Sequence, residues 1–296
     1  MVTIVRKVLQ LPLLLQLIGT FATGAQDVID VTELTPNVLV LATSSGNVVA
    51  SIGPDGALLI GTPSAASTAR IAEVLGQRTK SGMHYVVIFP ENSTHSEGDA
   101  GWGKRGAFVA MQEKALERLG GHTMGSPHPI PHHLLELGVG RPPIAFSEVL
   151  TFDMNGEAIH IVHQSAGYSD ADAIAHFHVA NLVYMGEVFS GDGYPQVDIE
   201  QHGNLNGLMK TLNSWAGGSI GVVPARGKVT NGDALKVFCD MIANVRDRIQ
   251  GMIAAGQTED QILAAHPTAP FDAQWGHGRV SPDAFVREIY SALKKH

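Results

Sequence analysis

Short β-rich runs occur in two series along this chain, and helices and further strands follow each series. The first series comprises residues 37–43, 46–53 and 56–61. The second comprises residues 148–152, 157–162, 173–179 and 182–189. Turn-forming residues such as Gly, Pro, Asp and Ser separate the runs. This duplicated plan predicts an α/β (α+β) chain in which two mixed sheets pack face to face between outer helices, because a four-layer αββα sandwich buries the apolar runs.

Helical patterns fall after and between the two series. They cover residues 64–77, 112–119 and 205–215, and three more begin at Asp233, Thr258 and Pro282. Single strands are predicted over residues 83–89, 106–111 and 218–224. A Pro- and His-rich segment over residues 122–143 shows little periodicity, which is typical of a long loop. No linker divides residues 26–296, so we expect a single domain there.

The first residues have the layout of a targeting segment. Arg6 and Lys7 precede an apolar run that ends in small residues before Ala25. This order predicts a secretory signal peptide over residues 1–25, and therefore a secreted or periplasmic protein without stable membrane insertion after cleavage. The alternative is a short membrane anchor, which Pro12 and the polar residues within the run disfavour.

Composition excludes one large class of partners and one kind of covalent link. The net charge of −8 and the absence of a dense Lys/Arg cluster argue against nucleic-acid binding, which needs a basic surface. The single cysteine, Cys239, has no second cysteine with which to form an internal disulfide. We expect Cys239 to be a buried apolar residue on the helix that begins at Asp233.

Several segments, in order, resemble the metallo-β-lactamase superfamily. The run "NVVASIGPDGALLIGTPSAASTARI" is similar to the opening hairpin and first helix of that family, and "YVVIF" to the strand before its metal loop. The segments "GWGKRGAFVAMQE", "IHIVHQSAGYSDADAIAHFHVANLVYMGEVF" and "SIGVVPARGKVTNGDALKVFCDMI" resemble the parts that follow. The resemblance runs from about Pro36 to the C-terminus, and it implies the αββα fold and a metal-dependent hydrolase.

The same resemblance implies that most metal ligands have been replaced. Residues that cannot ligate, or ligate poorly, stand at five ligand positions: Pro90, Asn92, Thr94, Tyr168 and Arg226. His95 and Glu187 keep ligand-capable side chains, and Gly61 replaces an aspartate that supports the site in the family. Catalytic zinc needs three protein ligands, so zinc is not expected here. A shifted alignment would offer His95, Glu97 and Asp99 as donors, at the cost of the match on both flanks.

Arg226 suggests what took the place of the metal. We hypothesise that its guanidinium pairs with Glu187, since a carboxylate left buried without a cation would be costly. The alternative is an Arg226 that turns out to solvent.

The leading functional prediction is a pseudoenzyme. It would bind a small anionic ligand or a partner protein in the cleft that holds the metal site in the family. Its predicted ligand-binding residues are Asn92, Thr94, His95, Tyr168, Glu187 and Arg226. The enzyme alternative is a divergent hydrolase of esters, lactones, thioesters or β-lactams. It would act without metal through His95 as base, Tyr168 as acid and Arg226 as oxyanion clamp, or with metal through rearranged ligands.

Other readings of the histidines and of the chain stay open. A relocated metal site would use His122, His128, His132 and His133, which lie close together in the sequence. His176 and His178 alternate on a strand and so share one face, where we expect a solvated pair. A purely structural interaction module has no sequence feature in its favour.

Overall fold

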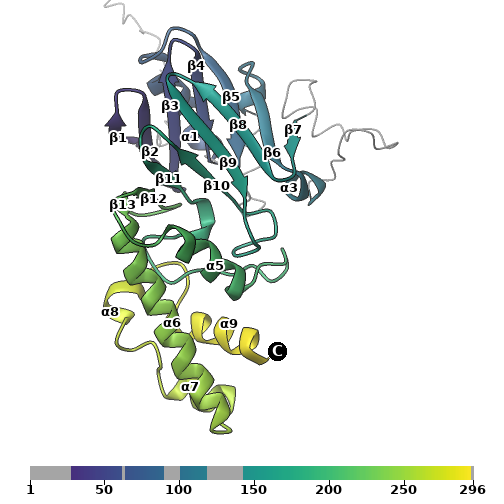
Figure 1. Ribbon diagram of the computed structural model, residues 1–296, viewed down its shortest axis with the longest axis vertical. Coiled ribbons are helices and arrows are strands. Elements are labelled where there is room, and N and C mark those ends of the chain that lie inside the picture. The colour runs from purple at the N-terminus through teal and green to yellow at the C-terminus, as the bar shows by residue number, and fades with distance from the viewer. Residues whose placement is uncertain (1–27, 62–63, 90–100, 119–142, 295–296) are drawn as a thin grey trace, which may run out of the picture.

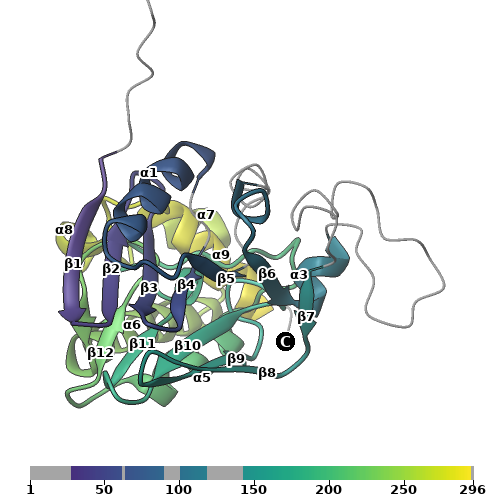
Figure 2. The same cartoon turned by 90° about the horizontal axis from the view of Figure 1, so that it is seen from above.

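The computed structural model describes residues 28–61, 64–89, 101–118 and 143–294. Two β-sheets lie face to face with helices outside them (Figures 1 and 2). The first sheet has seven strands in the order β1 to β7. Its strands are β1 (Asp30–Thr35), β2 (Val38–Ala42), β3 (Asn47–Gly53), β4 (Gly56–Ile60), β5 (Met83–Ile88), β6 (Phe108–Gln112) and β7 (Ile144–Phe146).

The second sheet has six strands in the order β13-β12-β11-β10-β9-β8. Its strands are β8 (Val149–Met154), β9 (Glu157–His163), β10 (Ala173–Phe177), β11 (Leu182–Tyr184), β12 (Gly221–Val223) and β13 (Thr230–Asn231). Both sheets are mixed. Strands β1 to β4 run antiparallel and β4 to β7 parallel, whereas in the second sheet β11 and β12 form the parallel pair.

Helices cover the outer faces of the two sheets, and more of them lie against the second sheet. Their bounds are α1 (Ala65–Gly76), α3 (Glu113–Arg118), the 3₁₀ turn η2 (Gly186–Val188), α5 (Leu205–Trp215), α6 (Gly232–Ala254), α7 (Glu259–Ala264), α8 (Asp272–Trp275) and α9 (Pro282–Lys294). Helix α1 begins where predicted, because the Ser64 hydroxyl accepts a hydrogen bond from the Ser67 amide. Among the described residues, no helix combines the length and the apolar character needed to cross a bilayer.

Three apolar clusters hold the layers together. The middle cluster joins the facing sides of both sheets through residues such as Leu58, Val87, Ile161 and Phe177. A second cluster packs the outer side of the first sheet against α1, and the third packs the outer side of the second sheet against α5 to α9. Seen from above, α1, the first sheet, the second sheet and α5 follow one another, so the predicted αββα sandwich is confirmed (Figure 2).

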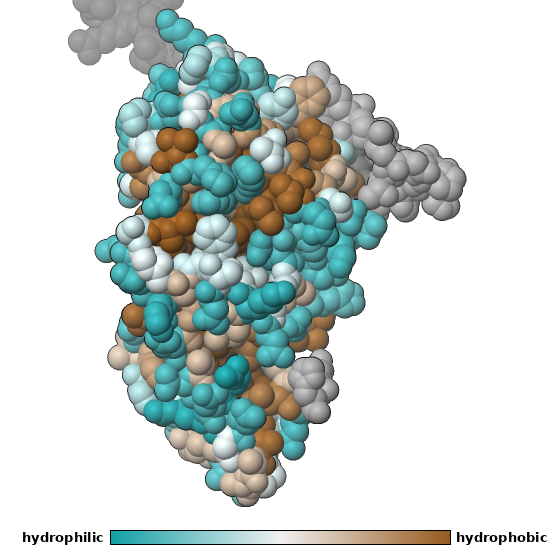
Figure 3. All heavy atoms as spheres, in the orientation of Figure 1, coloured by the Kyte–Doolittle hydropathy of each residue, from teal (hydrophilic) through white to brown (hydrophobic). Residues whose placement is uncertain are grey.

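One part of the sandwich keeps apolar side chains at the surface. Figure 3 shows hydrophobic residues gathered over the strands in the upper half of the molecule. Phe108, Ile144 and Val149, on β6, β7 and β8, are large hydrophobic residues that are exposed. The two sheets therefore do not bury their apolar residues completely along these strands.

Most predicted elements are confirmed, and the differences concern short pieces. Strands β1, β7 and β13 and helix α8 were not predicted, and the strand expected over residues 182–189 ends at Tyr184. Cys239 is buried on α6, as expected, and burial raises the pKa of its thiol to about 11. The predicted signal peptide and the histidine-rich loop lie outside the described residues.

A network of hydrogen bonds connects a hairpin of the second sheet to a hairpin of the first sheet. Asn155, in the turn between β8 and β9, has a positive φ of 57°. Its side chain accepts from the Asp55 amide at 3.0 Å and donates to the Gly56 carbonyl at 3.0 Å and the Ser51 hydroxyl at 3.1 Å. The Asn155 amide in turn donates to the Asp55 carboxylate at 2.7 Å. The β8–β9 hairpin is thereby tied to the β3–β4 hairpin of the other sheet.

Substitutions of Asn155 should separate the hydrogen bonds from the backbone conformation. Asn155→Gly keeps a residue that adopts positive φ but loses three side-chain hydrogen bonds, so we expect about 2–3 kcal/mol of destabilisation in urea unfolding. Asn155→Ala should cost about 1 kcal/mol more, because a Cβ is strained in the left-handed region. Equal stabilities of the two variants would contradict the backbone part of this account.

Candidate functional site

The structure describes some of the predicted site residues and brings two of them together. Pro90, Asn92, Thr94 and His95 lie outside the described residues, as do Glu97, Asp99 and the histidines between residues 122 and 133. Tyr168, Glu187 and Arg226 are described, and each lies in a turn or loop of the second sheet's half of the sandwich. The predicted roles of the residues outside the described ranges therefore stay predictions.

Arg226 and Glu187 form a two-point ion pair. The Arg226 Nη1 lies 2.7 Å from Glu187 Oε2, and its Nη2 lies 2.5 Å from Oε1. The side chains are only 11% and 8% exposed. The hypothesis that these residues pair is confirmed, and the alternative of an Arg226 turned out to solvent is wrong. Planar guanidinium and carboxylate groups meeting at two points give the strongest ion-pair geometry available to side chains.

The loop that carries Arg226 is held by Asn47, the first residue of β3. The Asn47 side-chain amide donates to the carbonyls of Pro224 at 3.0 Å and Gly227 at 2.9 Å, on either side of Arg226. The Asn47 backbone amide donates to the Ala225 carbonyl at 2.7 Å. Because β3 belongs to the first sheet and the loop follows a strand of the second, Asn47 joins the sheets beside the ion pair. In the sequence, Asn47 is a polar residue at the start of an otherwise largely apolar strand, and this was the available signal. We did not predict its role.

Glu187 is presented by a sharp turn instead of a strand. Gly186 adopts a φ of +51°, and a Cβ there would lie 2.7 Å from the Phe89 ring. A glycine is therefore required both for the backbone conformation and for the approach of Phe89. This turn ends β11 early and places Glu187 opposite the Arg226 loop.

Tyr168 lies in the loop between β9 and β10 and is 1% exposed. The loop folds around Asp172, whose carboxylate accepts hydrogen bonds from the Gly167 amide at 3.0 Å and the Ser169 amide at 2.8 Å. The Ser169 hydroxyl donates to the same carboxylate at 2.8 Å. Burial raises the pKa of Asp172 to about 7, although these hydrogen bonds act in the opposite direction. The predicted acid role of Tyr168 stays a prediction.

The described donors do not fit a metal ion at this position. Both carboxylate oxygens of Glu187 face the guanidinium, and Arg226 has no lone pair to donate. Within the described ranges, no group of three or more His, Cys, Asp and Glu side chains is arranged to hold a metal ion. The cation beside Glu187 is therefore a side chain of the protein.

The two strand histidines do share a face, as predicted. The rings of His176 and His178 lie 4.2 Å apart between centroids, and His160 of the neighbouring strand lies 4.6 Å from His178. Burial, followed by the neighbouring imidazoles, lowers the pKa of His176. His176 also packs against Trp215 of α5, so the pair is partly covered.

A groove of about 630 Å³ opens beside the Arg226 loop. Gly191 and Gly227 line the side of the groove nearest this loop. The Gly191 amide donates a hydrogen bond to the Arg226 carbonyl at 2.9 Å. Its walls are formed by Phe189, Gly191, Gly227, Lys228, Val229, Thr230, Ala234, Val237, Gln274 and Trp275. The groove thus combines largely apolar walls with Lys228, Thr230 and Gln274, and it adjoins the loop that carries Arg226.

Two comparisons of sequence found no match to this chain. No protein-family model matches it. No curated protein matches it either.

Comparison of structures finds proteins of one fold. The chain matches a metallo-β-lactamase from Pontibacter korlensis with a TM-score of 0.53 and 12% identity, over 72% of this chain and 99% of that one. It matches the DIM-1 metallo-β-lactamase with a TM-score of 0.51 and 11% identity, over 72% and 95% of the two chains.

A third match is longer than this chain. The inverting sec-alkylsulfatase Pisa1 from Pseudomonas sp. gives a TM-score of 0.66 at 13% identity. The match covers 89% of this chain and 50% of the alkylsulfatase, so the chain spans about half the length of that protein. With its two mixed sheets between helical layers, the chain has the metallo-β-lactamase fold.

Proposed function

We propose that this protein is a pseudoenzyme of the metallo-β-lactamase fold that binds a small ligand instead of hydrolysing one with metal. The observation that carries the proposal is the buried two-point pair of Arg226 and Glu187. A carboxylate already neutralised by a guanidinium has little affinity left for a metal ion, because the metal would have to displace a charged and hydrogen-bonded partner. The competing proposal is a divergent hydrolase that uses His95, Tyr168 and Arg226 or rearranged ligands.

The pair also limits where a ligand would bind. The charge of Arg226 is offset by Glu187, so this arginine is a weak attractor for an anion. The groove beside it offers Lys228 together with the apolar Phe189 and Trp275. A small anion with an apolar body fits this combination, because a positive group in a concave apolar site is sufficient for recognition.

Activity and metal content test the first part of the proposal. Purified protein, with and without added zinc, should not turn over nitrocefin, a lactone, a thioester, a carboxylic ester or a secondary alkyl sulfate above a buffer blank. Elemental analysis should find no stoichiometric zinc or iron. Turnover that a chelator abolishes and that Glu187→Gln reduces would overturn the pseudoenzyme in favour of the hydrolase.

A double-mutant cycle tests how strongly the two charges depend on each other. Arg226→Met and Glu187→Leu should each destabilise the protein by about 3–5 kcal/mol, because each leaves one buried charge without a partner. The double variant should be much closer to the wild type than the sum of the two, since no charge is then left buried. Urea unfolding measures all four proteins. Lys236→Met, which breaks an exposed pair with Asp240, is the control and should change stability little.

Anionic probes test the ligand. Benzoate and phenyl phosphate should perturb the groove in protein-observed NMR or raise the unfolding temperature, whereas benzylamine should not. Lys228→Gln should weaken the binding of both anions by about tenfold, as expected for the loss of one charge-assisted contact. Binding that is unchanged in Lys228→Gln would remove the groove as the site.

A further inference from the structure

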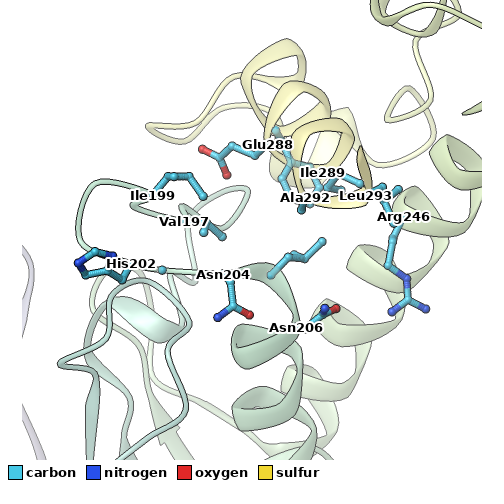
Figure 4. Close-up of a pocket in the computed structure, with 13 residues that line it drawn as sticks. Val197, Ile199, His202, Asn204, Asn206, Arg246, Glu288, Ile289, Ala292 and Leu293 are labelled. Carbon is cyan, nitrogen blue, oxygen red and sulfur yellow. The ribbon is translucent and has the colours of Figure 1, made fainter. Parts of the chain in front are cut away.

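A second cavity lies away from the ion pair, between α9, α6 and the start of α5. Its volume is about 320 Å³, within the range of small-molecule sites. Helix α9 forms one wall, α6 contributes Arg246, and the segment from Val197 to Asn206 forms the rest (Figure 4). It shares no lining residue with the groove beside Arg226.

The cavity has an apolar floor and a polar rim. Leu205, Phe285 and Ile289 of the lining are at most 5% exposed. Asn204 and Asn206 line it and are themselves exposed. A site with this distribution buries the apolar body of a ligand and leaves polar groups at its entrance.

Glu288 is the exception within the apolar wall. Its Oε2 is buried and has no hydrogen-bond partner among the described residues. Burial raises the pKa of Glu288 to about 7, although the nearby Val197 backbone amide acts to lower the pKa of its carboxyl. A buried carboxylate oxygen without a donor is costly, so this position requires an explanation.

The cation that lines the same cavity does not supply the missing donor. Arg246 donates to its neighbour Asp247 through Nε at 3.2 Å and Nη2 at 3.0 Å. In Figure 4 its guanidinium lies near Asn206, on the opposite side of the cavity from the Glu288 carboxyl. Glu288 itself extends from α9 toward the segment that carries Val197 and Ile199 (Figure 4). The described residues therefore leave Oε2 of Glu288 without a donor, although the residue lines the cavity.

We propose that this cavity binds a small primary amine with an apolar body, whose ammonium group meets Glu288 Oε2. The ammonium satisfies the unpartnered oxygen and offsets the carboxylate charge, and the apolar body covers Leu205, Phe285 and Ile289. A neutral alcohol satisfies the oxygen without offsetting the charge, and a carboxylate is repelled. The inference is independent of the proposed function, since it concerns a different cavity and different residues.

Three matched probes test the proposal on the full chain: n-hexylamine, hexan-1-ol and hexanoate, titrated at about pH 8, where the amine is charged and Glu288 is largely ionised. We expect hexylamine to bind at least about tenfold more tightly than hexanol, as charge-assisted hydrogen bonds do, and hexanoate not to bind. Calorimetry or protein-observed NMR gives the affinities. Failure of hexylamine to bind, or equal binding of all three probes, overturns the proposal.

Two variants of α9 assign the effect to the carboxyl. Glu288→Gln should keep the binding of hexanol, which shows that the cavity is intact, and lose the preference for hexylamine. Asp283→Asn, which removes an exposed charge from the same helix, should keep that preference. A preference that survives in Glu288→Gln contradicts the assignment to this residue.

The pH dependence gives a readout that cavity shape alone would not give. In the wild type the affinity for hexylamine should rise with pH through about 7, because the deprotonated carboxylate is the binding form. The other titratable groups that line the cavity are His202, on the segment before α5, and Arg246 on α6. A positive charge on His202 would oppose a bound cation, so His202→Gln is measured alongside. The rise should persist in His202→Gln and disappear in Glu288→Gln; the reverse result contradicts the proposal.

Discussion

The arrangement around the predicted metal position depends on one buried ion pair. Arg226 and Glu187 come from two turns that follow neighbouring parallel strands, β12 and β11, and only the close approach of those turns brings the charges together. The Asn47 amide fixes the Arg226 loop from the other sheet, and Gly186 bends the chain so that Glu187 faces it. A buried charge is tolerated only when its partner is held in place, so these supporting contacts and the pair require each other.

Two open sites among the described residues lie in the outer helical layer of the second sheet. The middle cluster between the sheets is closely packed, whereas the groove beside Arg226 and the cavity under α9 both lie where helices α5 to α9 meet loops. The groove combines apolar walls with Lys228, and the cavity combines an apolar floor with the Glu288 carboxyl on one side and Arg246 on the other (Figure 4). Under the two proposals the sites would select ligands of opposite charge, and neither uses the carboxylate that is bound to Arg226.

Much of the fold could be predicted from sequence, because the apolar runs are long enough to show their period and order. The pair could be hypothesised as well, because the resemblance places Arg226 and Glu187 at ligand positions, but only the structure decided against an Arg226 turned out to solvent. The role of Asn47 and the turn at Gly186 could not be predicted, because both depend on contacts between residues far apart in the chain. The unpartnered oxygen of Glu288 could not be predicted either. In the sequence of α9, Glu288 looks like any other charged residue, and only the structure shows that it lies against the segment that carries Val197.

We infer that the Arg226 guanidinium holds the place beside Glu187 that the sequence resemblance assigns to a metal ion. Diffraction at the zinc absorption edge from crystals grown with excess zinc tests this inference directly. We expect no anomalous peak at Glu187, together with density for the Arg226 guanidinium against both carboxylate oxygens. A zinc peak coordinated by Glu187, with Arg226 turned away from it, would contradict this inference.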